Sequence, residues 1–179
     1  MAESSEGKKV LVAYFSRTGE QYSVGNISEG NTAIIAKMIA EQTGGDLFEI
    51  KVAQDNYPQS YTALTEYAKK EKQQNARPEI VGKVDNFSGY DTIFIGYPNW
   101  WSDMPMPVYT FLESYDFTGK DVVPFCTHEG SGIGSTPGKV QGAVKGKVLN
   151  GFAIYGHTAQ NSRDEAKTKV SAWLKGLGF

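Results

Sequence analysis

Residues 10–19 read VLVAYFSRTG, six consecutive apolar and aromatic residues that run into a short polar loop ending in glycine. A strand without polar alternation is typical of a parallel sheet that helices cover on both faces. Two later runs, TIFIGY at residues 92–97 and VVPFC at residues 122–126, have a similar character. The three runs therefore predict the central strands of a parallel α/β sheet.

Two other runs predict the outer strands of this sheet. Residues 46–52 (DLFEIKV) alternate polar and apolar side chains, whereas residues 148–154 (VLNGFAI) contain an asparagine and a glycine, which are better tolerated near a sheet edge. Apolar residues at helical spacing predict helices over about residues 31–44, 61–74, 105–115 and 162–177. The chain therefore alternates strands and helices, as α/β proteins do.

We expect one domain over residues 9–179, preceded by a polar tail at residues 1–8. The predicted fold class is α/β: a three-layer sandwich in which a five-stranded parallel sheet of order 2-1-3-4-5 carries helices on both faces. The chain has 179 residues, of which 40% are hydrophobic and 12% aromatic, enough to build a core of this kind.

Composition excludes several classes of function. The chain has 18 Lys and Arg against 20 Asp and Glu, and this balance argues against nucleic acid or a membrane surface as partner. Cys126 has no second cysteine to pair with, and one Cys with two His argues against a metal site. No secretory leader or membrane-spanning run is evident, so we expect a cytoplasmic protein.

The loop after the first predicted strand is rich in hydroxyl groups and runs toward the start of the first helix. Hydroxyls and free backbone N–H groups at a helix N-terminus favour an anion such as phosphate. The same residue types also occur as ordinary turn and cap residues, so the loop alone leaves both interpretations open. The candidate residues are Ser16, Arg17, Thr18, Gly19, Asn31 and Thr32.

The loop after the third predicted strand contains Pro98, Asn99, Trp100 and Trp101. Two adjacent tryptophans in a loop are costly to expose, and a planar aromatic ligand would offer them a stacking partner. Packing of one tryptophan in the core and use of the other in a protein interface is the alternative.

The loop after the fourth predicted strand is dense in glycines, which allow close approach of backbone to a ligand. Its candidate residues are Thr127, His128, Gly130, Ser131 and Gly132. A merely flexible loop is the alternative. We assign His128 to contact, and we assign no residue of the chain to catalysis.

In a sheet of order 2-1-3-4-5 these three loops are neighbours beside the point where the strand order reverses, so one ligand site accounts for all three. In the order of these motifs the sequence resembles the flavodoxin family over about residues 9–179. The resemblance implies an FMN cofactor, with its phosphate on the first loop and its isoalloxazine ring between the other two.

The resemblance also implies residue roles. The hydroxyls of Ser16, Thr18 and Thr32 and the N–H groups of Gly19 and Asn31 would bind the phosphate, which Arg17 would only cover. Trp100 or Trp101 would stack on the ring, and Pro98 and Asn99 would line its reactive edge. The third loop would bind the pyrimidine side of the ring through Thr127, Gly130, Ser131 and Gly132, with His128 in contact.

The sequence departs from the family pattern in two places. Residues 20–30 interrupt the phosphate loop and must loop out, and residues 97–104 contain no glycine, which many flavodoxins carry beside the reactive nitrogen of the flavin. The leading expectation is an FMN-binding redox protein in electron transfer, whose partner is a redox protein or a small-molecule electron acceptor.

Two alternatives stay open at this point. One is an NAD(P)H-dependent flavin oxidoreductase of the quinone reductase type, which requires an open face over the flavin ring. The other is a non-redox, receiver-like binding module, which requires carboxylates at the ends of the first and third strands. Phe15, Ser16, Tyr97 and Pro98 stand at those ends.

Overall fold

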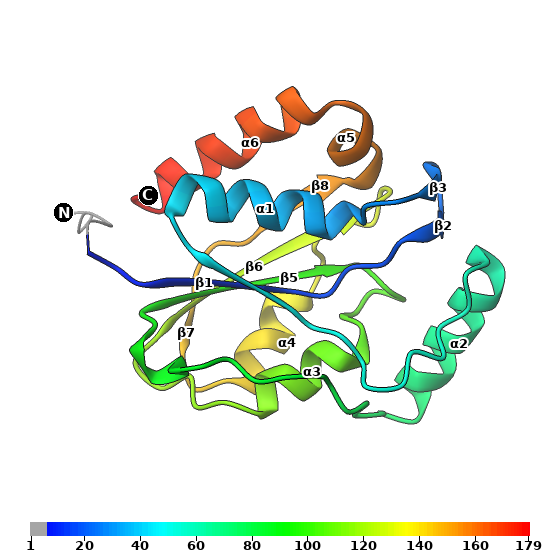
Figure 1. The fold of residues 1–179 in the computed structure, drawn as a ribbon, viewed down its shortest axis with the longest axis horizontal. Helices are drawn as coiled ribbons and strands as arrows, with labels where there is room; N and C mark the ends of the chain where they lie inside the picture. The colour runs from blue at the N-terminus through cyan, green and yellow to red at the C-terminus, as the bar shows by residue number, and fades with distance from the viewer. Residues whose placement is uncertain (1–6) are drawn as a thin grey trace.

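The structure, a computed structural model, describes residues 7–179 (Figure 1). Only Gly7 and Lys8 of the expected tail fall within the described residues. The main sheet is parallel, with β4 at one edge, then β1, β5 and β6, and with β7 and β8 both paired to the far side of β6. The strands are β1 (Val10–Tyr14), β4 (Asp46–Glu49), β5 (Thr92–Pro98), β6 (Asp121–His128), β7 (Lys147–Val148) and β8 (Phe152–Tyr155). Because β7 and β8 together form the fifth strand, the predicted order 2-1-3-4-5 is confirmed.

The fifth strand is divided, and the sequence explains the division. The Val122 carbonyl accepts a hydrogen bond from Leu149 N, so Val122 faces the outer strand. Residues two apart along a strand face the same neighbour, and the next such residue of β6 is Pro124, which has no N–H to donate. Pairing resumes at Phe125 with Phe152. The expectation of one strand over residues 148–154 is corrected to two short strands.

The second strand is also shorter than expected. β4 ends at Glu49, because the chain beyond it turns to pair with a different segment. Val81 N donates to the Lys51 carbonyl at 2.7 Å, and Val52 forms an antiparallel bridge with Ile80.

Helices cover both faces of the sheet, as Figure 1 shows. On one face lie α1 and α6 with the short α5, and on the other lie α3 and α4. The helices are α1 (Asn31–Thr43), α2 (Tyr61–Gln73), α3 (Met106–Glu113), α4 (Thr136–Ala143), α5 (Gly156–Asn161) and α6 (Arg163–Gly176), with a 3-10 turn η1 (Phe87–Gly89). The four predicted helices are confirmed to within two residues at each end. α4 and α5 were not predicted, because neither has a strong helical spacing of apolar residues.

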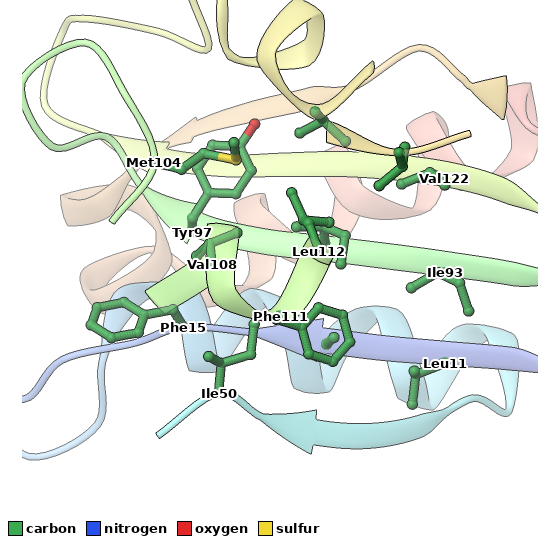
Figure 2. Close-up of a cluster of buried hydrophobic side chains, with 14 of the residues drawn as sticks. Leu11, Phe15, Ile50, Ile93, Tyr97, Met104, Val108, Phe111, Leu112 and Val122 are labelled. Atoms are coloured by element: carbon green, nitrogen blue, oxygen red, sulfur yellow. The ribbon is translucent and has the colours of Figure 1, made fainter. Parts of the chain in front are cut away.

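Successive residues of β1 point to opposite faces, and two buried cores result. Val12 packs with Ile35 of α1 on one side, and Leu11 packs with Phe111 of α3 on the other. Figure 2 shows the second core, in which side chains of β1, β5 and β6 meet those of α3. Burial on both faces fixes β1 as a central strand whose carboxyl end opens into the predicted site.

The segment that interrupts the first loop forms a small antiparallel hairpin of β2 (Gly19–Gln21) and β3 (Gly25–Ile27). It stands beside the start of α2 (Figure 1). The Glu20 carboxylate accepts a hydrogen bond from Tyr61 N at 3.0 Å, and Glu20 N donates to the Gln59 carbonyl at 3.3 Å. The hairpin therefore docks on the N-terminal end of α2. Within residues 7–179, no helix is both long and apolar enough to span a membrane.

Candidate functional site

The carboxyl ends of β1, β5 and β6 meet at one edge of the sheet, and the three loops that follow them surround a cleft with two lobes. The first lobe, of about 240 Å³, is lined by Gln21, Tyr22, Asn31, Tyr61, Pro98, Asn99, Trp100, Thr127, His128, Glu129 and Ser131. The second lobe, of about 390 Å³, is lined by Gln21, Tyr61, Leu64, Thr65, Ala68, Asn99, Trp100, Trp101, Ser102 and Ser131. The shared lining residues show that the lobes adjoin.

The first loop is built around the start of α1. The Ser16 hydroxyl accepts a hydrogen bond from Ala33 N at 3.1 Å and so caps the helix from the preceding loop. A Cβ atom at Gly30 would lie only 2.0 Å from Ser16 Oγ, so this contact requires glycine. The Ser16 hydroxyl keeps its proton to donate, and the helix start adds its free N–H groups.

Asn31 is the residue of the first loop that lines the first lobe. Its Oδ1 atom is buried and has no hydrogen-bond partner within residues 7–179. An unpaired buried acceptor costs about 1–3 kcal/mol, a cost that a ligand hydroxyl or N–H would remove. Gly156 leaves space for this side chain, since a Cβ there would come within 2.4 Å of Asn31 Nδ2.

The hydroxyl of Thr32 forms a hydrogen bond within the protein. Thr32 is 2% exposed, and its Oγ1 lies 2.8 Å from Oγ1 of Thr127, itself 3% exposed. This hydrogen bond ties the start of α1 to the end of β6, and only Thr127 of the two lines the first lobe.

Arg17 points away from both lobes. Its Nη1 donates to Asp55 Oδ2 at 2.7 Å, and its guanidinium lies 5.1 Å from the ring centre of Tyr57. Thr18 lines a separate hollow with Ser16 and Arg17, and Gly19 begins the hairpin. The structure therefore places residues 16–19 beside the cleft and outside the lining of its two lobes.

The loop after β5 contains a tight turn closed by reciprocal backbone hydrogen bonds between Trp100 and Asp103, at 2.9 and 3.1 Å. Trp101 and Ser102 have φ values of +54° and +59°, a region that bulky residues rarely adopt. Such conformations cost of order 1–3 kcal/mol each and persist where their surroundings hold them. Lys72 Nζ donates a hydrogen bond to the Trp101 carbonyl at 2.6 Å and helps to stabilise this backbone conformation.

The side chain of Asp103 holds the turn in place. Its side chain is 8% exposed, and it accepts hydrogen bonds from the Tyr109 hydroxyl at 2.6 Å and from Met104 N at 2.7 Å. Lys139 lies 3.1 Å and Lys72 3.9 Å from its Oδ2. Burial, reinforced by the hydrogen bond to Asp103, raises the pKa of Tyr109, so this hydroxyl stays a donor.

The turn separates the two tryptophans. Trp100 packs edge-on against Phe15 and Tyr57, with ring centres 5.3 and 5.6 Å apart, and it lines both lobes. Trp101 is 45% exposed and lines the second lobe only, with its indole N–H donated to the Thr65 carbonyl at 2.8 Å. Of the two candidate stacking residues, only Trp100 reaches the first lobe.

The loop after β6 is joined to the tryptophan loop by Asn99. Asn99 Nδ2 donates to the Gly132 carbonyl at 3.0 Å, and Asn99 N donates to the Thr127 carbonyl at 2.9 Å. Gly130 and Gly132 have φ values of +121° and +67°, which glycine adopts without strain. These two glycines shape the loop, and Ser131 between them lines both lobes.

His128 accepts a hydrogen bond from Gly130 N at its Nδ1 atom, at 2.9 Å. Burial lowers the pKa of His128, so the imidazole is neutral at neutral pH with its proton on Nε2. The ring packs 4.7 Å from Tyr155, and Glu129 beside it is engaged with His157 at 2.7 Å. His128 therefore offers one N–H donor at the rim of the first lobe.

Sequence reasoning missed the part of the lining that the hairpin and α2 supply. Gln21 and Tyr22 lie in the interrupting segment, and Tyr61, Leu64 and Ala68 lie on one face of α2. The i, i+3, i+4 spacing of Leu64, Tyr67 and Ala68 was a usable signal for a buried face, but not for what that face contacts.

These features define a class of protein: a doubly wound α/β domain with a ligand cleft at the carboxyl edge of its sheet, beside the strand-order switch point. A model of the flavodoxin family matches residues 9–175. The chain belongs to the flavodoxin family, as its motifs indicated.

Solved structures agree with this assignment. A candidate flavoprotein from Bacteroides eggerthii is 31% identical with a TM-score of 0.74, over 97% of this chain and 99% of that chain. Another from Bacteroides uniformis is 32% identical with a TM-score of 0.72, over 94% and 99%. A flavoprotein from Lactobacillus acidophilus in complex with FMN shares the fold at 24% identity and a TM-score of 0.63, over 87% and 98%. A comparison with curated proteins gave no match.

Proposed function

We propose that this chain is an FMN-binding redox protein that acts in electron transfer. The observation that carries the proposal is the first lobe at the strand-order switch point, which Asn31 and Trp100 both line. The Oδ1 atom of Asn31 is buried there and has no hydrogen-bond partner among residues 7–179. Membership of the flavodoxin family supports FMN as the occupant. Bound FMN would supply a ring that takes up and releases electrons.

The chain's own residues fit the parts of FMN. The Ser16 hydroxyl and the N-terminal N–H groups of α1 would hold the phosphate, as helix starts favour anions. Asn31 would accept a hydrogen bond from a hydroxyl of the ribityl chain. The roles expected for Thr18, Gly19 and Thr32 at the phosphate stay predictions, and those for Thr18 and Gly19 require the loop to close on the ligand.

The ring would lie against Trp100, with polar groups at its margin. Thr127, His128 and Ser131 line the same lobe, and the neutral His128 would donate through Nε2. Trp100 is held edge-on by Phe15 and Tyr57, so its orientation is set before the cofactor binds. Preorganised aromatic contact reduces the ordering cost of binding.

The test is the affinity for FMN, measured by quenching of flavin fluorescence. Asn31→Ala removes the unpaired acceptor, and we expect FMN affinity to fall about 5–100-fold, the equivalent of about 1–3 kcal/mol. Asn161→Ala, at the exposed end of α5, is the matched control and should leave the affinity unchanged. Failure of the native protein to bind FMN would contradict the proposal.

A second candidate function is an NAD(P)H-dependent flavin oxidoreductase. The second lobe favours it, because about 390 Å³ lies open beside Trp100, next to the proposed place of the ring. Anaerobic reduction of the FMN-loaded protein, followed by visible absorbance, separates the two. Bleaching by NADH or NADPH would indicate the enzyme, whereas reduction by dithionite alone would indicate a carrier that depends on a partner reductase.

A further inference from the structure

The hairpin of β2 and β3 brings an aromatic side chain to the first lobe. Tyr22 lies in the turn of this hairpin, is 59% exposed, and lines the lobe together with Tyr61 of α2, which is 37% exposed. The two ring centres are 5.6 Å apart, with 31° between the ring planes. Single exposed aromatic residues are common, but these two form a pair that borders a hollow. Such a pair indicates a surface that another molecule covers.

The hairpin is held at the lobe by contacts that do not involve the Tyr22 ring. The Glu20 carboxylate accepts a hydrogen bond from Tyr61 N at 3.0 Å, and the Gln21 amide donates to the carbonyls of residues 17 and 18 at 3.4 Å. Figure 1 shows the hairpin beside the start of α2, on the side of the molecule where the strands of the sheet end. A change of the Tyr22 side chain should therefore leave the hairpin docked.

Trp100 forms a separate aromatic wall of the same lobe. Within residues 7–179, the aromatic rings that pack against Trp100 are those of Phe15 and Tyr57. Tyr22 and Tyr61 line the lobe without packing on Trp100, so the hollow lies between the tyrosine pair and the indole. A flat aromatic ligand in this hollow would offer one face to each wall.

The loop after β6 does not provide such a wall. Residues 127–135 (THEGSGIGS) contain no Phe, Tyr or Trp, and the imidazole of His128 packs against Tyr155 at 4.7 Å. The side chains that this loop adds to the lining belong to Thr127, His128, Glu129 and Ser131. These polar groups suit the margin of a ring better than its face. Beyond Trp100 and His128, the aromatic lining of the lobe consists of Tyr22 and Tyr61.

We propose that Tyr22 and Tyr61 cover the face of the flavin ring that is turned away from Trp100. The segment that interrupts the phosphate loop would then serve as an aromatic cover for the cofactor. The inference rests on the proposed function and gives residues 20–30 a role that the family resemblance does not supply. With both faces covered, only the edge of the ring stays accessible, and a nicotinamide would have to displace the hairpin in order to stack on it. The cover therefore favours electron transfer over the reductase.

The test compares FMN with riboflavin, which has the same ring and lacks the phosphate. In Tyr22→Ala we expect the affinity for both flavins to fall by the same factor, about 2–10-fold, the usual effect of one aromatic pair. Tyr22→Phe keeps the ring and should bind both flavins like the native protein. Asn26→Ala, an exposed position of β3 that lines neither lobe, is the matched control and should also leave both affinities unchanged. Quenching of flavin fluorescence measures all of these affinities.

Hydrogen exchange of the hairpin gives a second measurement that does not depend on affinity. At saturating FMN, the ring contact should slow deuterium exchange of the amides of residues 19–27 in the native protein and in Tyr22→Phe. In Tyr22→Ala, also saturated with FMN, this protection should be lost. Saturating riboflavin should give the same pattern, because the phosphate takes no part in the contact.

Each other outcome overturns the proposal. Native-like affinity of Tyr22→Ala for both flavins would show that the hairpin does not cover the ring, and would leave the proposed function standing. Loss of affinity for FMN with native-like affinity for riboflavin would show that the hairpin acts on the phosphate. If the native protein binds neither flavin, the cover and the proposed function both fail.

A second variant tests the other tyrosine of the pair. Tyr61→Ala should also weaken the binding of both flavins by an equal factor of about 2–10. Circular dichroism of the variant checks that α2 is retained. Native-like binding of both flavins by Tyr61→Ala would overturn the assignment of the pair as the cover.

Discussion

The side chain of Asp103 stabilises the turn that carries Trp101 at the edge of the cleft. It is buried, it accepts hydrogen bonds from the Tyr109 hydroxyl and from Met104 N, and it pairs with the two lysines that bond to carbonyls of the strained turn. Nothing in the sequence around residues 98–107 marks this aspartate as different from a surface one. Its importance depends on Lys72 and Lys139, which come from two different helices.

We expect Asp103→Asn to lower the free energy of unfolding by about 1–3 kcal/mol, because it leaves buried donors with a poorer partner. Urea unfolding measures the change. Asp85→Asn, at an exposed loop position, is the control and should stay within about 0.5 kcal/mol of the native value. Equal stability of the two variants would show that the turn does not depend on this carboxylate.

His128 gives the protein a pH dependence with a defined sign. Burial lowers its pKa from the ordinary 6.5, with His157 adding to the effect and Glu129 opposing it. The unfolded chain therefore binds a proton at a pH where the folded chain does not. This contribution to stability is complete above about pH 6.5 and is lost as the pH falls through that value toward the lower folded pKa.

His128→Gln should remove this contribution. We expect the variant to lose less stability than the native protein between about pH 7.5 and pH 5, measured as the shift of the urea midpoint. An identical pH dependence in the two proteins would show that other groups set it.

At the scale of elements, α2 is the least anchored helix beside the cleft. Only Leu64 and Ala68 of its 13 residues are buried, whereas α1, of equal length, buries seven. Few buried contacts correspond to low local stability. The hairpin of β2 and β3 compensates in part, because Glu20 bonds to the N-terminal end of α2.

We expect backbone amides of α2 to exchange with deuterium faster than those of α1, and Glu20→Ala to accelerate exchange in α2 alone. Hydrogen exchange followed by mass spectrometry measures both. Glu66→Ala, on the exposed face of α2, serves as the control. Unchanged protection of α2 in Glu20→Ala would show that the hairpin does not support this helix.

The elements predicted well are those in which a local pattern of apolar residues is enough to indicate burial. Residues 10–15 are apolar throughout and residues 92–97 are mostly so, and each run predicts a buried strand without knowledge of what packs against it. The sequence did not predict α4, because this helix contains two glycines and few apolar residues. Its tertiary contacts, rather than its composition, stabilise it. The division of the fifth strand depends on Pro124, a residue of the neighbouring strand.

The candidate site was predicted at the level of loops and less well at the level of side chains. Arg17 bonds to Asp55, 38 positions away in the sequence, and so points away from the cleft. The Thr32 hydroxyl bonds to the Thr127 hydroxyl, 95 positions away. Trp101 turns outward because of a backbone conformation that tryptophan rarely adopts. Such long-range partners and rare conformations leave no local trace in the sequence.

For the whole molecule, cofactor binding and folding are linked. A ligand that binds only the folded chain at about 100 times its Kd stabilises it by about 2.7 kcal/mol. For a domain of this size that corresponds to a rise in Tm of about 5–10 °C. Thermal unfolding with FMN should show this rise, and riboflavin at the same concentration should give a smaller one, since it lacks the phosphate. Equal rises would contradict the assignment of the phosphate to the start of α1.

The division of the outer strand opposite Pro124 has a consequence for association. A long, straight outer strand presents a row of free N–H and C=O groups on which another chain can add a strand. Here that row is broken between Val148 and Phe152, and the opposite margin of the sheet is only the four residues of β4, which carries Asp46 and Glu49. Neither margin offers an uninterrupted template, so the sheet resists growth by addition of strands from other molecules.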